Sequence, residues 1–314
     1  MSKLDAVFTD AVLDECTQNI VELNSMLTEN AAQAAYNQVI FESAMDYVTE
    51  AEDEKEFKNG KVGNALYKAL DTLKRVFKTV FDKIRAAINA FIAKINANSA
   101  AKWIKNYSKE KNYDWGAAYV TPKKYLAIKN PDQVFLLDQG VGELVALGDE
   151  EKVAKKLVAN IKVPTSNYSK AKEALSKATT IAEVNKVLLS FTSYADDYND
   201  KPMDLATILE AIPDAGKTFA EMKSSYKSAI NKINTGIKNT YSEIQNASTQ
   251  EEKDAIKKEI SLAEKLMSFY YAAYVGYMKY YTAMNSATIA NIKAAKKGGV
   301  EVEESATFMG LALL

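Results

Sequence analysis

The sequence has no histidine and only one cysteine, Cys16. Without histidine the chain lacks both the commonest general base and the commonest metal ligand. A single cysteine excludes a disulfide bond within the chain. We therefore expect a non-enzymatic protein that binds no cofactor or metal and has no small-molecule substrate.

Glycine and proline are also scarce, with 12 and 5 among 314 residues. Because both residues interrupt helices, their scarcity favours long helices over a strand-and-turn fold. We predict a mainly α protein: an elongated helical bundle with a long C-terminal antiparallel αα-hairpin and little or no β-structure. The predicted segments are an acidic helical segment (1–60), a basic amphipathic helix (61–98), an aromatic and lysine-rich connection (99–148), a small helical domain (149–212), the long hairpin (213–297) and a docking tail (298–314).

Charge is distributed unevenly along the chain. Residues 1–60 contain 13 acidic and 3 basic side chains, whereas residues 61–105 contain 10 basic and 2 acidic ones. An acidic leader therefore precedes a basic helix, and the two could pair or separate under regulation. The first five residues do not form a basic region followed by an apolar core, so we expect no secretory signal.

The basic helix has two distinct faces. Its apolar positions recur every three or four residues, close to a heptad pattern. They are Leu66, Leu70, Leu73, Phe77, Val80, Ile84, Ile88 and Phe91. The basic face includes Lys74, Arg75, Lys78, Lys83 and Arg85. Packing against other helices is the expected role of such a stripe, while binding to an anionic membrane or to DNA remains an alternative.

A short motif precedes this helix. The stretch Phe41–Glu52 is acidic and leads into the lysine-rich helix, and Val48-Thr49-Glu50 is close to an aliphatic-x-Glu pattern. Together these features resemble virion proteins of large tailed bacteriophages, in which head-maturation proteases cut after such a glutamate. The family pattern has Ile or Leu where this chain has Val48. The resemblance implies a virion component, made in the host cytoplasm, with Glu50 as a processing site.

Residues 99–148 alternate aromatic side chains with lysines, a pattern that can bind single-stranded nucleic acid. The alternative is a connection whose aromatic rings cover the ends of neighbouring helices. Extended pieces are predicted at 117–120 and 125–128. Asn130 and Pro131 then predict a helix start.

From Asp149 the pattern is helical again, with one helix ending before Pro164 and another beginning after Thr180. Pro202 is predicted to open a further helix through Ile212. The acidic cluster at 196–200 lacks the ligand spacing of a calcium loop and is interpreted as a polar turn.

Residues 211–218, AIPDAGKT, fit a relaxed phosphate-binding loop. A true loop of this kind leaves a buried strand, whereas 203–212 repeats with helical spacing. We therefore interpret Pro213 and Gly216 as a break between helices and expect no nucleotide site.

The two arms of the predicted hairpin are 214–246 and 250–297, with Thr249 and Glu252 forming a capping box. The second arm is rich in tyrosine, and Lys279 is its only charge between Leu266 and Ile292. Its tyrosines make it a poor membrane span. We predict burial in the bundle or at an interface with another subunit, with Tyr270, Tyr274, Tyr277 and Tyr281 as candidate interface residues.

After Gly298 and Gly299, the segment 301–314 combines acidic residues with an apolar end. Such a segment is expected to dock on its own chain or on a neighbour. The predicted function is that of a structural protein of a virion, capsid- or tail-associated, which packs against other virion proteins or copies of itself. The alternative is a membrane-active or DNA-contacting internal virion protein that uses the basic helix.

Overall fold

The protein is mainly α-helical, as predicted. The computed structural model describes residues 148–164, 167–197, 202–204 and 249–297 continuously, residues 119–120, 126, 128, 131–135 and 144 in part, and scattered positions at 10–25, 75, 86 and 228–243. The continuous ranges contain one very long helix and a cluster of short ones. Their packing explains most of the described core.

The central element is helix α13, Gln250–Lys296, which is 47 residues long. At 1.5 Å per residue it extends about 70 Å. The predicted capping box starts it: the Thr249 hydroxyl accepts from the Glu252 N–H, and the Glu252 carboxylate accepts from the Thr249 N–H. Glu251 and Glu252 in its first turn and Lys293 and Lys296 in its last turn complement the helix dipole.

Burial of α13 is greatest in its middle. The seven consecutive residues Ala272–Met278 are all buried. Because successive residues of an α-helix are rotated by about 100°, seven of them cover the whole circumference. This part of α13 is therefore enclosed on all sides, with Lys279 as the exposed exception that follows it.

Three short helices form a cluster beside α13. They are α8 (Glu150–Asn160), α9 (Ser169–Ser176) and α10 (Ile181–Leu189), and the 3-10 helix η1 (Phe191–Tyr194) follows α10. Asp149 caps α8 by accepting from the Lys152 N–H, and Thr180 with Glu183 forms a capping box for α10. The helix breaks predicted before Pro164 and at Thr180 are confirmed.

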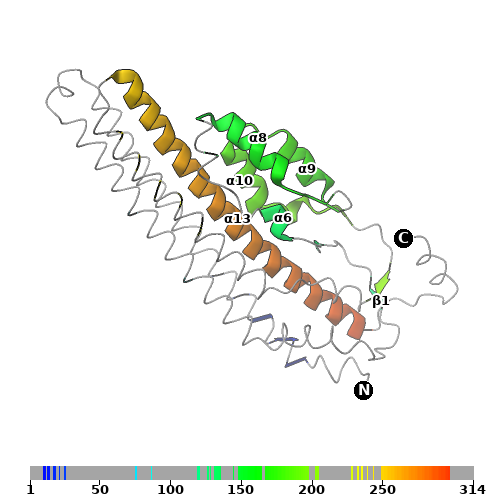
Figure 1. Cartoon of the computed structure of the whole chain (residues 1–314). Helices are drawn as coiled ribbons and strands as arrows, with labels where there is room; N and C mark the ends of the chain where they lie inside the picture. Colours follow the sequence, from blue (N-terminus) through cyan, green and yellow to red (C-terminus); the bar gives the residue numbers. More distant parts are fainter. Residues whose placement is uncertain are drawn as a thin grey trace.

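Helix α10 is the middle layer of the structure. It makes the most extensive contact with α13 and also packs against α8 and α9. The short helix α6, Pro131–Phe135, begins at the predicted proline and contacts α13 directly. Figure 1 shows α6, α8, α9 and α10 gathered on the same side of α13.

The described strands form one antiparallel pair of two residues each, β1 (Tyr119–Val120) and β2 (Met203–Asp204). Strand β1 confirms the extended piece predicted at 117–120 for its last two residues, and the first two lie outside the described residues. Strand β2 corrects the prediction that Pro202 opens a helix, because Met203 and Asp204 pair with β1 instead. Local apolar spacing did not reveal this long-range pairing.

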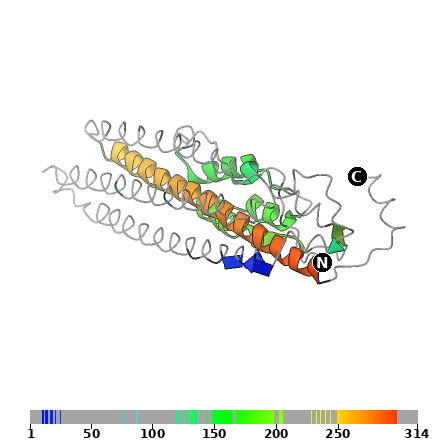
Figure 2. The ribbon, with the colours of Figure 1, turned by 90° about the horizontal axis from the view of Figure 1, so that it is seen from below.

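The N-terminal region meets the far end of α13. Leu13 is helical and buried, and Asp10 and Asp14 form ion pairs with Lys296 and Lys293 at 2.7 and 3.7 Å. Figure 2 shows these N-terminal residues beside the last turns of α13. Two carboxylates of the acidic leader therefore contact α13, whereas the predicted pairing of the leader with the basic helix falls largely outside the described residues.

Candidate functional site

The candidate residues of the basic helix are mostly outside the described part of the chain. Of its basic face, Arg75 is described, and it is helical and exposed. The apolar stripe Leu66–Phe91, the remaining basic residues and Glu50 lie outside the described residues. A protein, lipid or DNA partner of this helix therefore stays a prediction.

The tyrosine candidates on α13 are core residues of this chain. Tyr270, Tyr274, Tyr277 and Tyr281 are each 5% exposed or less. Of the two predicted alternatives, burial within the bundle is the one that the structure describes. These four side chains are not available to contact another subunit, because their rings are already covered by their own chain.

An aromatic cluster joins α13 to the short helices. Phe135 lies edge-on to Phe191 and to Tyr277, with ring centroids 5.5 Å apart in both pairs. Phe191 stacks on Tyr168 at 4.5 Å. Such contacts between large buried rings stabilise a packing arrangement beyond simple area burial. The cluster thus fixes α6, η1 and the start of α9 against α13.

Two tyrosine hydroxyls bind backbone groups of Leu126 and Ile128, two described positions of the predicted extended piece 125–128 that have no regular secondary structure. The Tyr280 hydroxyl accepts from the Ile128 N–H at 2.8 Å, and the Tyr168 hydroxyl donates to the Leu126 carbonyl at 2.7 Å. Burial raises the pKa of Tyr168, because the phenolate would lose its hydration. The Tyr280 hydroxyl therefore satisfies a buried backbone N–H, and the Tyr168 hydroxyl satisfies a partly buried carbonyl.

Gly276 allows the closest approach between α10 and α13. A Cβ atom at this position would lie 2.3 Å from the Leu188 carbonyl oxygen and 3.1 Å from Phe135 Cε1. Glycine in a helix interior costs about 1 kcal/mol relative to alanine. The close contact explains why this cost is tolerated.

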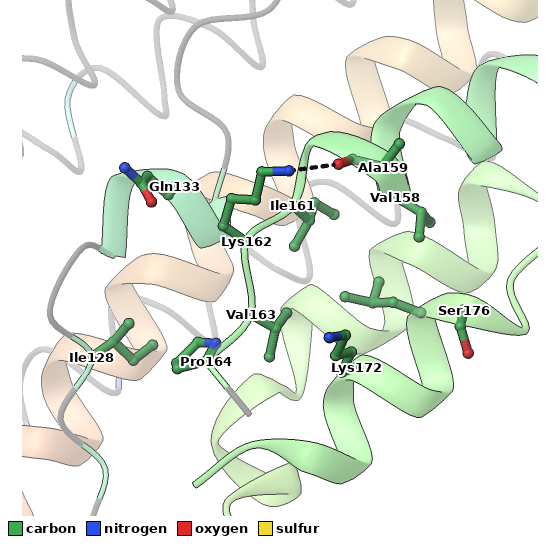
Figure 3. Close-up of a pocket in the computed structure, with 11 residues that line it drawn as sticks. Ile128, Gln133, Val158, Ala159, Ile161, Lys162, Val163, Pro164, Lys172 and Ser176 are labelled. Atoms are coloured by element: carbon green, nitrogen blue, oxygen red, sulfur yellow. Dashed lines mark hydrogen bonds between the residues drawn. The ribbon is translucent and has the colours of Figure 1, made fainter. Parts of the chain in front are cut away.

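A cleft of about 520 Å³ opens on the outer side of the short helices. Its walls come from the end of α8, the loop 161–164, α9, α6 and Ile128. Most of the lining is apolar, including Val158, Ile161, Val163 and Leu175. Figure 3 shows these walls, with α8 and the following loop facing α9. A volume of this size is typical of sites for a small ligand or a few side chains.

Two lysines give the cleft its charge. Lys162 and Lys172 line it together with the neutral polar residues Gln133 and Ser176, and no acidic side chain is among the lining residues. Lys162 Nζ donates to the Ala159 carbonyl at 3.1 Å, as drawn in Figure 3. No carboxylate of the described residues forms an ion pair with either lysine. The cleft can therefore accept an apolar group that carries negative charge beside it.

The frame of the cleft is held by backbone and side-chain contacts. The Lys162 N–H donates to the Gln133 carbonyl at 3.0 Å, which ties the loop after α8 to α6. Asp196 accepts from the Ser169 N–H at 3.1 Å and from its hydroxyl, so it caps α9 from a distant loop. Since both walls are fixed in this way, the cleft is a built feature of the fold.

Glu150, the first residue of α8, makes both an ion pair and a hydrogen bond to a backbone N–H. Lys265 on α13 contacts Glu150 at 2.5 Å, and the other carboxylate oxygen of Glu150 accepts from the Ile181 N–H at 3.2 Å. Glu150 therefore joins the starts of α8 and α10 to α13. This arrangement is explained by packing and needs no ligand.

Like charges meet along α13 near its start. The pKa of Glu259 is raised by partial burial and by the charge of Glu243. The five described positions between 228 and 243, spaced three or four apart, are helical and exposed. They fit the outer face of the predicted first arm, whose apolar stripe lies outside the described residues.

The described residues contain no group of three or more carboxylate, cysteine or histidine side chains that could bind a metal ion. Asp196, from the acidic cluster interpreted as a polar turn, caps α9 instead. Residues 211–218 of the relaxed phosphate-loop pattern lie outside the described part.

No helix in the described part of the chain is long and apolar enough to cross a membrane. This result includes α13, in which tyrosines and Lys279 interrupt the apolar character.

Sequence reasoning did not find the cleft. Its lining comes from segments up to 48 residues apart, from Ile128 to Ser176, and each wall resembles an ordinary amphipathic helix. The two lysines could have been noticed only after the helices were assembled. No protein-family model, no curated protein and no solved structure matches the chain.

Proposed function

We propose that the chain is a non-enzymatic structural protein that acts through helical packing as a component of a bacteriophage particle. The observation that carries this proposal is helix α13. It is an uninterrupted helix of 47 residues, enclosed on all sides in its middle, so it forms a rigid axis about 70 Å long. A rigid axis of this length suits a protein that spaces or supports other subunits.

The lack of histidine and the single cysteine support the non-enzymatic part of the proposal. Four of the described carboxylates have structural roles: Glu150 joins helices, Asp196 caps α9, and Asp10 and Asp14 attach the N-terminal region. The assignment to a particle comes from the resemblance of 41–52 and the following basic helix to phage virion proteins.

The direct test is quantitative mass spectrometry of particles purified by two density-gradient steps. Peptides from Asp149–Lys162 and from α13 should be present in constant ratio to the major shell protein across the gradient peak. Detection of these peptides in the infected-cell extract but not in the particles would contradict the proposal.

A further inference from the structure

The last part of α13 has one face that is open to solvent. Up to Met278 the middle of the helix is enclosed on all sides, and the enclosure ends at the next residue. The exposed positions that follow are Lys279, Ser286, Ala290, Ala294 and Lys297. At about 100° per residue, these five positions fall within about 80° of one another around the helix axis. They therefore form one continuous surface, which we call the open face.

The composition of the open face is unlike that of a solvated helix surface. A helix surface that faces water normally has charged side chains, as the start of α13 does with Glu251, Asp254 and Lys258 exposed. Between the two lysines of the open face, the described exposed residues are one serine and two alanines, and the half-exposed Ala283 and Ala287 lie beside them. Because the distance between packed helices depends on the side chains at the contact, this face would let another helix approach closely.

The segment that directly follows α13 has a complementary composition. Residues 301–314 begin with Glu301, Glu303 and Glu304, contain no basic residue, and continue with Phe308, Met309 and three leucines. Removing such large apolar side chains from water is favourable, and the open face is the described surface nearest to them along the chain. We propose that residues 301–314 fold back as a helix and dock antiparallel to α13 on the open face of the same chain.

The lengths of the two surfaces match. The 14 residues 301–314 extend about 21 Å as a helix, and the open face between Lys297 and Ala283 also extends about 21 Å. The reversal falls on Gly298 and Gly299, which adopt turn conformations without steric cost. Connections of two to five residues commonly join two antiparallel helices. The segment can therefore reach the open face without a long linker.

This arrangement also places unlike groups together. With the reversal at the two glycines, Glu301 lies beside Lys297, Phe308 lies beside Ala290, and the last leucines lie beside Ala283. No carboxylate of the described residues forms an ion pair with Lys297. The acidic part of the segment therefore meets a cation at the end of α13, and the apolar part meets the uncharged part of the open face.

This inference goes beyond the proposed function and does not depend on it, since it concerns contacts within one chain. A second copy of the chain, or a different protein, could place a helix on the same face. The short connection favours the segment of the same chain, because tethering by a short linker gives an effective concentration in the millimolar range. The experiment separates these occupants.

The test uses the full-length chain with Phe308→p-benzoylphenylalanine, which cross-links to neighbouring C–H bonds under near-ultraviolet light. We expect intrachain cross-links to the tryptic peptide 280–293, which contains the middle of the open face. Irradiation of an equal mixture of isotopically labelled and unlabelled protein shows whether both peptides come from one chain. Cross-links between labelled and unlabelled chains, cross-links to other parts of the chain, or none at all would overturn the proposal.

A steric variant provides a second readout. Ala290→Arg places a long charged side chain at the centre of the open face and should lower the initial cross-linking rate at least tenfold. The position is exposed, so helix content measured by circular dichroism should be preserved. Ala255→Arg is the matched control, because Ala255 is exposed on the same helix about 53 Å away and should leave the rate unchanged. An undiminished rate in Ala290→Arg would show that the segment binds elsewhere.

A charge variant tests the register of the docked segment. Lys297→Glu should lower the initial cross-linking rate about two- to fivefold, the range that an exposed ion pair supports. Lys258→Glu, at an exposed position near the start of α13, is the control and should leave the rate unchanged. Equal rates in the two variants would contradict the antiparallel register, in which Glu301 lies beside Lys297.

Discussion

Replacement of Gly276 by alanine tests the packing of α10 on α13. The added Cβ would lie 2.3 Å from the Leu188 oxygen and 2.9 Å from the Leu188 carbonyl carbon, whereas ordinary contacts begin near 3.4 Å. The two backbones would therefore have to separate by about 1 Å at their closest point. Both partners are backbone atoms, so no side chain can rotate away to relieve the overlap.

The expected magnitude follows from two opposing effects. Overpacking of a well-filled core costs about 1–3 kcal/mol, and a backbone clash belongs at the upper end of that range. Alanine gains about 1 kcal/mol over glycine in helix propensity. We expect Gly276→Ala to lower the free energy of unfolding by about 2 kcal/mol. For a chain of this size the unfolding midpoint should fall by roughly 3 °C.

Thermal unfolding followed by circular dichroism at 222 nm measures this effect. Ser286→Ala is the control, because Ser286 lies on an exposed part of the same helix and should change the unfolding free energy by less than about 0.5 kcal/mol. If Gly276→Ala is as stable as the parent chain or more stable, α10 and α13 do not approach each other as described.

Three further predictions concern buried contacts and charge. Tyr280→Phe leaves the Ile128 N–H buried without its acceptor and should cost about 1–3 kcal/mol in urea unfolding; an unchanged midpoint would refute this contact. Asp196→Ala removes the long-range cap of α9 and should cost about 1 kcal/mol, with faster amide exchange confined to α9; exchange that is unchanged there would be inconsistent with the cap. Glu259 has a raised pKa in the folded chain, so the folded state holds its proton more tightly and stability decreases as pH rises above the unfolded pKa. Glu259→Gln should therefore raise the unfolding midpoint at pH 7 but not at about pH 3.5, and a stabilisation that persists in acid would exclude burial of the Glu259 charge and its repulsion by Glu243 as the cause.

Local features of the fold could be predicted from the sequence. The capping boxes at Thr180 and Thr249 involve residues three apart, so the hydrogen bonds form within one turn. The start of α6 at Pro131 is equally local, because proline fits the first turn of a helix. The length of α13 could be predicted because no proline occurs in the sequence after Thr249.

Features that depend on assembly could not be predicted in this way. The pairing of β1 with β2 joins residues more than 80 positions apart, and the apolar spacing of 203–212 pointed to a helix instead. The role of Gly276 depends on how closely α10 approaches, which the sequence of α13 alone does not encode. The cleft has the same origin, because Lys162 lies in the loop after α8 and Lys172 in α9, and their side chains share a cleft only in the folded chain.

The tyrosines of α13 show an intermediate case. Their number and spacing correctly indicated burial, because a ring with a hydroxyl suits a site where one end finds a hydrogen-bond partner. The sequence did not specify which partner. In the structure the Tyr280 hydroxyl bonds to Ile128, 152 positions away, and the rings of Tyr270, Tyr274, Tyr277 and Tyr281 are covered by their own chain.

The central claim, that the chain is a structural component of a particle, is tested most directly by its copy number and intact mass in purified particles. We expect a constant ratio to the major shell protein that survives a high-salt wash, since apolar packing does not weaken with ionic strength as charge contacts do. The intact mass also reports whether the chain has been cut after Glu50. A ratio that varies between preparations, or that falls to zero after the wash, would contradict the claim.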